Sequence, residues 1–218
     1  HFDTAMAQRY AMLEGAWLAR TLGDTGAADW YEAQARGIEA RLQRHWDPAR
    51  GYLVSALDRD EGLDYKSSGL DAAVILAAIH RRPLDEQVLS PSQQAFFSPS
   101  DPRVLATAYA LKRAFKAGYQ VNQRDLPGTA IGRYPEDQYF GGNPWVLLTL
   151  AFSQLDTMAA REFMSKRAIP IHAADLLFFK DLLEDPADQA ALRAGVVLTP
   201  ADPLFTKIIL GMMKESDG

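Results

Sequence analysis

The feature that most constrains this chain is the spacing of its apolar residues, which recur every three or four positions over most of its length. That spacing is the period of an amphipathic α-helix. In the first stretch the recurring residues are Phe2, Met6, Tyr10, Leu13 and Trp17. We expect this helix to have Asp3 or Thr4 as its N-cap and to stop at Gly23. The pattern predicts an all-α protein.

The same spacing predicts roughly six further major helices. They cover residues 31–46, 69–80, 101–118, 143–158, 171–183 and 203–214, with a short helix after Asp185-Pro186. Asp101-Pro102 and Asn143-Pro144 each combine a side-chain acceptor with a proline, which is a typical helix start. Residues 51–57 are the only stretch with strand character. Helix pairs in this order fit a toroid or a solenoid as well as a bundle, in one domain over residues 1–218.

Two stretches, residues 82–100 and 119–143, lack helical periodicity. We expect the first to be a long surface connection. The second is too long for an ordinary connection between packed helices, and loops of that length often carry function.

Composition excludes several kinds of protein. Hydrophobic residues make up 48% of the 218 positions and charged residues 23%, which is ordinary for a globular protein and excludes disorder. The formal net charge is -5 with both signs interspersed, so no basic surface for nucleic acid is expected. The longest apolar run, residues 145–152, is far shorter than the roughly 20 residues that span a bilayer. We therefore expect a soluble protein without nucleic-acid or membrane partners.

Cysteine is absent, which excludes disulfides, thiolate nucleophiles and zinc sites built from cysteine. The four histidines have no metal-ligand spacing, so neither a metal nor another cofactor is expected. The sequence starts at His1 without a signal-like segment, and we expect that processing or truncation removed the natural start.

Residues 132–145, GRYPEDQYFGGNPW, carry the strongest functional signal. Arg133 offers a rigid fork of donors, the two acidic residues offer acceptors, and four aromatic residues offer flat faces. A sugar ring needs this mixture, because its paired hydroxyls suit planar bidentate partners and its apolar face suits an aromatic ring. The segment therefore indicates a glycan ligand.

A purely structural interpretation of the same loop stays open. Arg133 would then pair with Glu136 or Asp137 to brace the loop, while Tyr139 and Trp145 would pack in the core. Charged and aromatic loop residues commonly have such roles.

The segment closely resembles the glucoamylase signature of glycoside hydrolase family 15, in which G-R-Y-P-E-D is followed shortly by G-N-P-W. Other segments resemble that family in the same order along the chain, namely Gln8-Arg9-Tyr10 with Glu14-Gly15, residues 71–80, and residues 100–106. The likeness is faint beyond residue 160. The resemblance implies an (α/α)6 toroid of the six-hairpin type, about half of it in this chain, and a catalytic domain truncated at both ends.

Members of the family remove glucose from the non-reducing ends of starch-like α-glucans with inversion, using one carboxylic acid and one carboxylate base. The resemblance therefore implies an α-glucan or maltooligosaccharide substrate, no cofactor, and a secreted or periplasmic location. It places the general acid upstream of His1 and the general base beyond Gly218, so this chain would hold neither. We expect the isolated chain to be inactive and poorly stable, with apolar faces of residues 1–20 and 203–214 uncovered.

Within the signature, the resemblance assigns sugar binding first to Arg133. Four further residues would line or brace the pocket, and these are Tyr134, Glu136, Asp137 and Trp145. Pro135 and Pro144 would be structural, and Asn143 would be a helix N-cap.

Two carboxylates outside the signature need a separate interpretation. Glu215 does not match the context of the family's general base, and we expect it to be solvated at a frayed helix end. Asp71, in an apolar helix, could be catalytic on charge alone, but we expect a satisfied core group or a helix cap. Two other functions remain open: a paralogue that binds α-glucan without cleaving it, and a helical scaffold for protein contacts.

Overall fold

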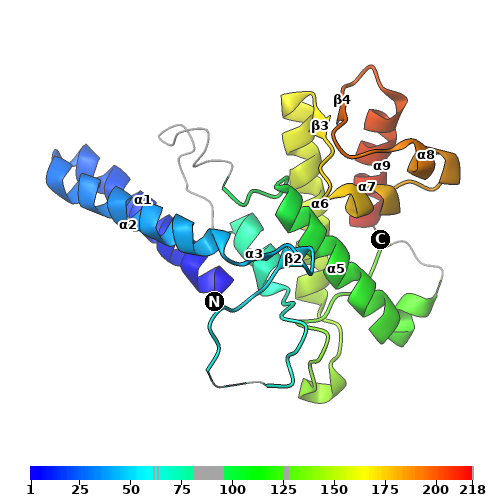
Figure 1. The fold of residues 1–218 in the computed structure, drawn as a ribbon, viewed down its shortest axis with the longest axis horizontal. Coiled ribbons are helices and arrows are strands. Elements are labelled where there is room, and N and C mark those ends of the chain that lie inside the picture. The colour runs from blue at the N-terminus through cyan, green and yellow to red at the C-terminus, as the bar shows by residue number, and fades with distance from the viewer. Residues whose placement is uncertain (61, 63, 81–95, 125–127, 218) are drawn as a thin grey trace.

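The computed structural model describes residues 1–60, 62, 64–80, 96–124 and 128–217, and it confirms the prediction of a helical chain (Figure 1). The elements in order are α1 (Phe2–Thr21), α2 (Thr25–Gln43), β1 (Trp46–Asp47), β2 (Tyr52–Leu53), α3 (Ala73–His80), α5 (Pro102–Gly118), η1 (Gln120–Gln123), η2 (Tyr139–Gly141), α6 (Val146–Lys166), β3 (Ile169–Pro170), α7 (Leu176–Asp181), α8 (Pro186–Ala191), β4 (Val197–Leu198) and α9 (Pro203–Asp217). Among these described residues, no helix is both long enough and apolar enough to cross a membrane.

Helices α1 and α2 form a hairpin that projects from the rest of the molecule (Figure 1). Arg9 of α1 is buried in this hairpin, and its Nε donates to Glu39 of α2 at 2.8 Å. The predicted apolar stripe of α1 is therefore only partly right, because Arg9 faces inward while Trp17 is 40% exposed. Helix α2 begins before the predicted residue 31, since the Asp24 carboxylate caps it by accepting from Ala27 N at 2.9 Å.

The core lies where α3, α5, α6 and α9 pack together (Figure 1). Most of the apolar residues of α3 are buried, as expected for a helix enclosed by its neighbours. The first turn of α1 joins this core, because the Phe2 and Phe97 rings meet edge to face at 5.1 Å. Each large side chain buried in this way contributes about 1.5–3 kcal/mol to folding.

Helix starts were predicted well where the cap is local. Asp101 caps α5 by accepting from Arg103 N at 2.8 Å, and Asp185 caps α8 by accepting from Ala187 N at 2.8 Å. The predicted N-cap of α1 is wrong, because His1 occupies that position and Ser55 O accepts from Phe2 N at 2.8 Å. Gly23 follows α1 with a φ of +80°, which confirms it as the stop.

The predicted start of α6 at Asn143-Pro144 is wrong. Trp145 N donates to Ile131 O at 2.9 Å, which holds Trp145 in an extended conformation, and the helix begins only at Val146. Asn143 is consequently not an N-cap, and its side-chain amide donates to Phe140 O instead.

Other predicted boundaries are wrong for related reasons. Helix α3 begins four residues later than the predicted residue 69, because Gly69 has a φ of +71°. The helix predicted over residues 171–183 is reduced to α7, because β3 pairs with the distant β4 in a second two-stranded antiparallel sheet that was not predicted from the sequence. The strand expected in residues 51–57 is β2, which pairs with β1. The predicted surface connection at residues 82–100 lies mostly outside the described residues, and Phe97 within it is buried.

Candidate functional site

The loop of residues 132–145 leads into α6, and close backbone approaches fix its shape. A Cβ at Gly132 would lie 1.8 Å from Tyr119 Oη, and a Cβ at Gly142 would lie 2.3 Å from Asp137 O. Within the loop, Tyr139 N donates to Asp137 Oδ1 at 3.0 Å. A side chain at Gly132 would therefore require the Tyr119 ring to shift. At Gly142, with a φ of +72°, both the space and the backbone conformation require glycine, which lets the loop turn sharply before α6.

This loop borders a hollow of about 530 Å³. Six of the lining residues belong to the loop, and these are Arg133, Tyr134, Asp137, Gln138, Tyr139 and Trp145. Arg133 is exposed, and its guanidinium carbon lies 5.6 Å from the centre of the Tyr134 ring. The loop side of the hollow thus combines a planar cation, an acid, an amide and three aromatic rings, which suits a polyhydroxylated ring with an apolar face.

The alternative in which this loop has a purely structural role does not fit the positions of its side chains. Arg133 forms no ion pair with Glu136 or Asp137 within the part of the chain that the structure describes. Tyr139 is 71% exposed and Trp145 is 41% exposed, so neither packs in the core. These side chains are free to contact a ligand.

Tyr134 differs from its neighbours because its side chain is almost entirely buried, at 4% exposure. The Lys66 ammonium lies 4.3 Å from the centre of its ring and also forms an ion pair with Asp71. A side-chain hydrogen bond to Tyr65 raises the pKa of the Tyr134 hydroxyl to about 12. The Tyr134 hydroxyl is therefore uncharged at neutral pH, and its side chain is held in a fixed position at the base of the hollow.

Glu136 does not line the hollow. Its carboxylate accepts from Ser68 N at 2.6 Å, from Ser68 Oγ at 3.0 Å and from Ser67 Oγ at 3.3 Å. These bonds fasten the loop to the segment that precedes α3. Of the five residues predicted from the signature, four therefore lie at the hollow and Glu136 braces it.

Asp71 and two of the four histidines have structural partners. Asp71 Oδ1 accepts from Ala73 N at 2.9 Å and caps α3, which agrees with the predicted helix cap. His45 Nδ1 lies 2.6 Å from Val54 O, and His172 Nδ1 lies 3.2 Å from Asp175 Oδ2. Over the described residues, no group of three or more potential metal ligands is found.

The prediction that Glu215 is solvated is wrong. Its carboxylate lies 3.1 Å from Lys112 Nζ, and the same ammonium lies 3.0 Å from Asp156 Oδ2. Burial would lower the pKa of Lys112, but the charges of Asp156 and Glu215 outweigh it and raise that pKa. Burial raises the pKa of the Asp156 carboxyl. This buried cluster ties α9 to α5 and α6.

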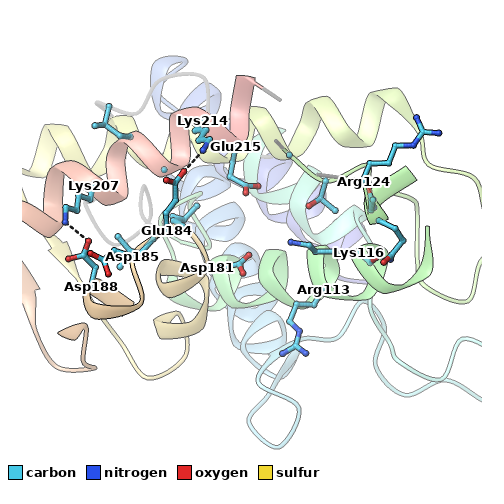
Figure 2. A pocket seen from close by; sticks show the side chains of 18 of the residues that line it. Arg113, Lys116, Arg124, Asp181, Glu184, Asp185, Asp188, Lys207, Lys214 and Glu215 are labelled. Atoms are coloured by element: carbon cyan, nitrogen blue, oxygen red, sulfur yellow. Dashed lines mark hydrogen bonds and ion pairs between the residues drawn. The ribbon is translucent and has the colours of Figure 1, made fainter. Parts of the chain in front are cut away.

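A larger groove of about 1250 Å³ lies between α5, α7, α8 and α9, away from the signature loop. Figure 2 shows charged side chains along it, with Lys207 joined to Asp188 and Lys214 joined to Glu184. No aromatic side chain lines it among the residues that the structure describes. Because this larger groove offers no flat apolar face, the smaller hollow is the better candidate for a sugar.

Three residues of the hollow were not among the five site residues assigned from the family resemblance. Gln138 and Tyr139 lie within the recognised motif, so their positions could have been included. Tyr65 comes from the segment between β2 and α3, and no local pattern links it to the signature loop.

Comparisons with known proteins identify the family that the chain resembles. The family described as glycosyl hydrolases family 15 matches residues 1–211. The chain is 31% identical over 188 residues to glucoamylase 1 of Rhizopus oryzae, covering 83% of this chain and 29% of that protein. It is 34% identical over 184 residues to glucoamylase P of Amorphotheca resinae, covering 83% of this chain and 28% of that protein.

A solved structure, the family 15 glucoamylase of Hypocrea jecorina, superimposes with a TM-score of 0.82 at 30% identity. That match covers all of this chain and 34% of the Hypocrea chain. The described helices therefore correspond to part of the (α/α)6 toroid, as expected from the sequence. The chain spans about a third or less of the length of these relatives.

Proposed function

The chain belongs to glycosyl hydrolases family 15, and on that basis we propose that it is part of an exo-acting α-glucosidase that releases glucose from α-glucans. Its contribution is a sugar-binding wall. The observation that carries this proposal is the exposed Arg133 guanidinium at a hollow walled by Tyr134, Tyr139 and Trp145. A planar fork of donors binds adjacent hydroxyls, and the rings cover the apolar face of the sugar.

Inverting hydrolysis needs a carboxylic acid and a carboxylate about 6.5–9.5 Å apart, with a water molecule held between them and the sugar. Asp137 is the one carboxylate that lines the hollow in the described part of the chain. Its Oδ1 already accepts from Tyr139 N, which makes it an orienting group of the loop. We therefore assign substrate binding to this chain, and the acid and base to other parts of the whole protein.

Nuclear magnetic resonance on the chain of residues 1–218 tests the binding role. The indole N–H of Trp145, assigned with a Trp145→Phe variant, reports directly on the hollow. We expect a saturable shift of this signal with millimolar maltose and none with sorbitol. In Arg133→Ala the apparent affinity should fall at least about tenfold, since hydrogen bonds to a charged group contribute about 1.5–3 kcal/mol.

Arg161→Ala is the matched control, because Arg161 is exposed on α6 about four turns beyond Trp145. This variant should bind maltose as the unmodified chain does. A maltose shift that is absent, or that Arg133→Ala leaves unchanged, contradicts the proposed function.

A further inference from the structure

Tyr65 is the lining residue of the hollow that comes from outside the signature loop, among the residues that the structure describes. It lies between β2 and α3, and its side chain is 45% exposed. The hollow therefore has a second wall, from a part of the chain distant in sequence.

The segment that carries Tyr65 is held on two sides. On one side, Tyr52 Oη donates to Ser68 O at 2.8 Å, and Ser55 N donates to Gly69 O at 2.8 Å. On the other side, the Glu136 carboxylate accepts from the backbone and the hydroxyl of Ser68. Because these bonds connect it to both the β1–β2 hairpin and the signature loop, the segment presents its side chains to the hollow from a defined position.

A second bond joins the two walls directly, since Ala72 N donates to Arg133 O at 2.8 Å. Displacing the segment would therefore also displace the backbone of Arg133. The segment that carries Tyr65 and the signature loop are therefore held together by hydrogen bonds.

The side chains of Tyr65 and Tyr134 interact, and a hydrogen bond between them raises the pKa of Tyr134. A tyrosine hydroxyl has one proton and two acceptor lone pairs, so the Tyr65 hydroxyl can pair with Tyr134 and still form a hydrogen bond to a ligand. Lys66, next in sequence, packs over the Tyr134 ring and keeps that ring in place.

We propose that Tyr65 is a further sugar-binding residue of this site, which forms a hydrogen bond to a sugar hydroxyl and covers the sugar with its ring. The inference rests on the proposed function. It places the bound sugar between the Arg133 wall and the Tyr65 wall. The residue that closes the hollow thus lies in a segment where the family signature gives no indication of it.

The Trp145 maltose titration tests this inference with two variants. Tyr65→Phe removes the hydroxyl and keeps the ring, and it should weaken maltose binding about two- to tenfold. Tyr65→Ala removes both and should weaken binding further. Tyr109→Phe is the matched control, because Tyr109 lies on α5 with its hydroxyl 3.5 Å from Arg113 Nη1, and it should leave binding unchanged.

A merely structural role predicts a different pattern. If Tyr65 only held Tyr134, then Tyr134→Phe would weaken binding as much as Tyr65→Phe, whereas direct contact requires the larger loss in Tyr65→Phe. Should Tyr65→Ala not fold, as judged from its amide spectrum, the phenylalanine variants still decide between these roles. Saturable binding that Arg133→Ala weakens and both Tyr65 variants leave intact overturns this inference alone, while no binding by the unmodified chain overturns the proposed function with it.

Discussion

At residue 45 the fold encloses an imidazole in a place that favours its neutral form. His45 is buried, its ring meets Phe2 edge to face at 5.4 Å, and its Nδ1 lies 2.6 Å from Val54 O. Because the carbonyl can only accept, we assign the hydrogen to Nδ1. Burial lowers the pKa of His45 in the folded chain.

This lowered pKa predicts a loss of stability in mild acid. Below about pH 6.5 the unfolded chain binds a proton at this residue and the folded chain does not, so the free energy of unfolding falls by up to about 1.4 kcal/mol per pH unit. In His45→Asn this part of the pH dependence should disappear. Urea denaturation between pH 7.5 and 5.5 measures it, with His80→Asn as the exposed control. Equal slopes in His45→Asn and the unmodified chain would show that His45 is not responsible.

The buried cluster around Lys112 gives a second prediction at this scale. Lys112→Met removes the counter-charge of Asp156, whose Oδ1 has no hydrogen-bond partner among the described residues. We expect a loss of about 3–5 kcal/mol in the free energy of unfolding, most of which Lys112→Met with Asp156→Leu should restore.

Arg44→Met, which breaks an exposed ion pair with Asp58, is the matched control and should cost less than about 1 kcal/mol. Urea denaturation compares the three proteins. If Lys112→Met were no more destabilising than Arg44→Met, the cluster would not be holding α9 in place.

At the scale of elements, two adjacent glycines allow backbone strain to be compared with steric overlap. Gly141 and Gly142 have φ angles of +78° and +72°, but only at Gly142 would an added Cβ meet a backbone oxygen, at 2.3 Å. Gly141→Ala should cost about 1–2 kcal/mol through conformational strain alone. Gly142→Ala should cost clearly more and should also weaken the maltose shift at Trp145, because the loop must move away from Asp137. Urea denaturation measures both variants, and similar unfolding free energies for the two would contradict the described loop.

At this scale, the sequence could predict a helix start or a strand only where residues close in sequence determine it. Asp101 and Asp185 cap helices through neighbours two residues away, so the pattern alone located both starts. The start of α6 depends on a hydrogen bond from Trp145 to Ile131, and no helix rule contains that contact. Pairing of β3 with β4 likewise depends on chain segments that meet only in the fold.

The same distinction between local and distant contacts applies to the candidate site. Arg133 and its aromatic neighbours could be found because they share one motif. Tyr65 and the Lys112 partner of Glu215 could not, because each joins the site or the cluster across a long stretch of sequence.

At the scale of the whole molecule, the chain exposes apolar surface on several helices. Trp17 and Leu18 on α1, Leu147 on α6 and Leu210 on α9 are all exposed, which agrees with the expectation of uncovered faces on the first and last helices. The chain corresponds to about a third of its solved relative.

We predict that residues 1–218 alone release no glucose from maltose. The physical reason is the shortage of carboxylates at the hollow, where Asp137 alone lines it within the described residues. A coupled glucose assay over several hours makes the measurement, with Arg133→Ala to identify contaminating activity. Glucose release that disappears in Arg133→Ala would show that this chain holds its own catalytic pair.

The central claim is that Arg133 binds an α-glucan in the hollow of the signature loop. The most direct measurement is a crystal structure of the chain with maltotriose. We predict a sugar ring whose hydroxyl oxygens lie within hydrogen-bond distance of the Arg133 guanidinium, between Tyr65 and Trp145. A maltotriose bound instead in the groove of Figure 2, or bound without contact to Arg133, would contradict the claim.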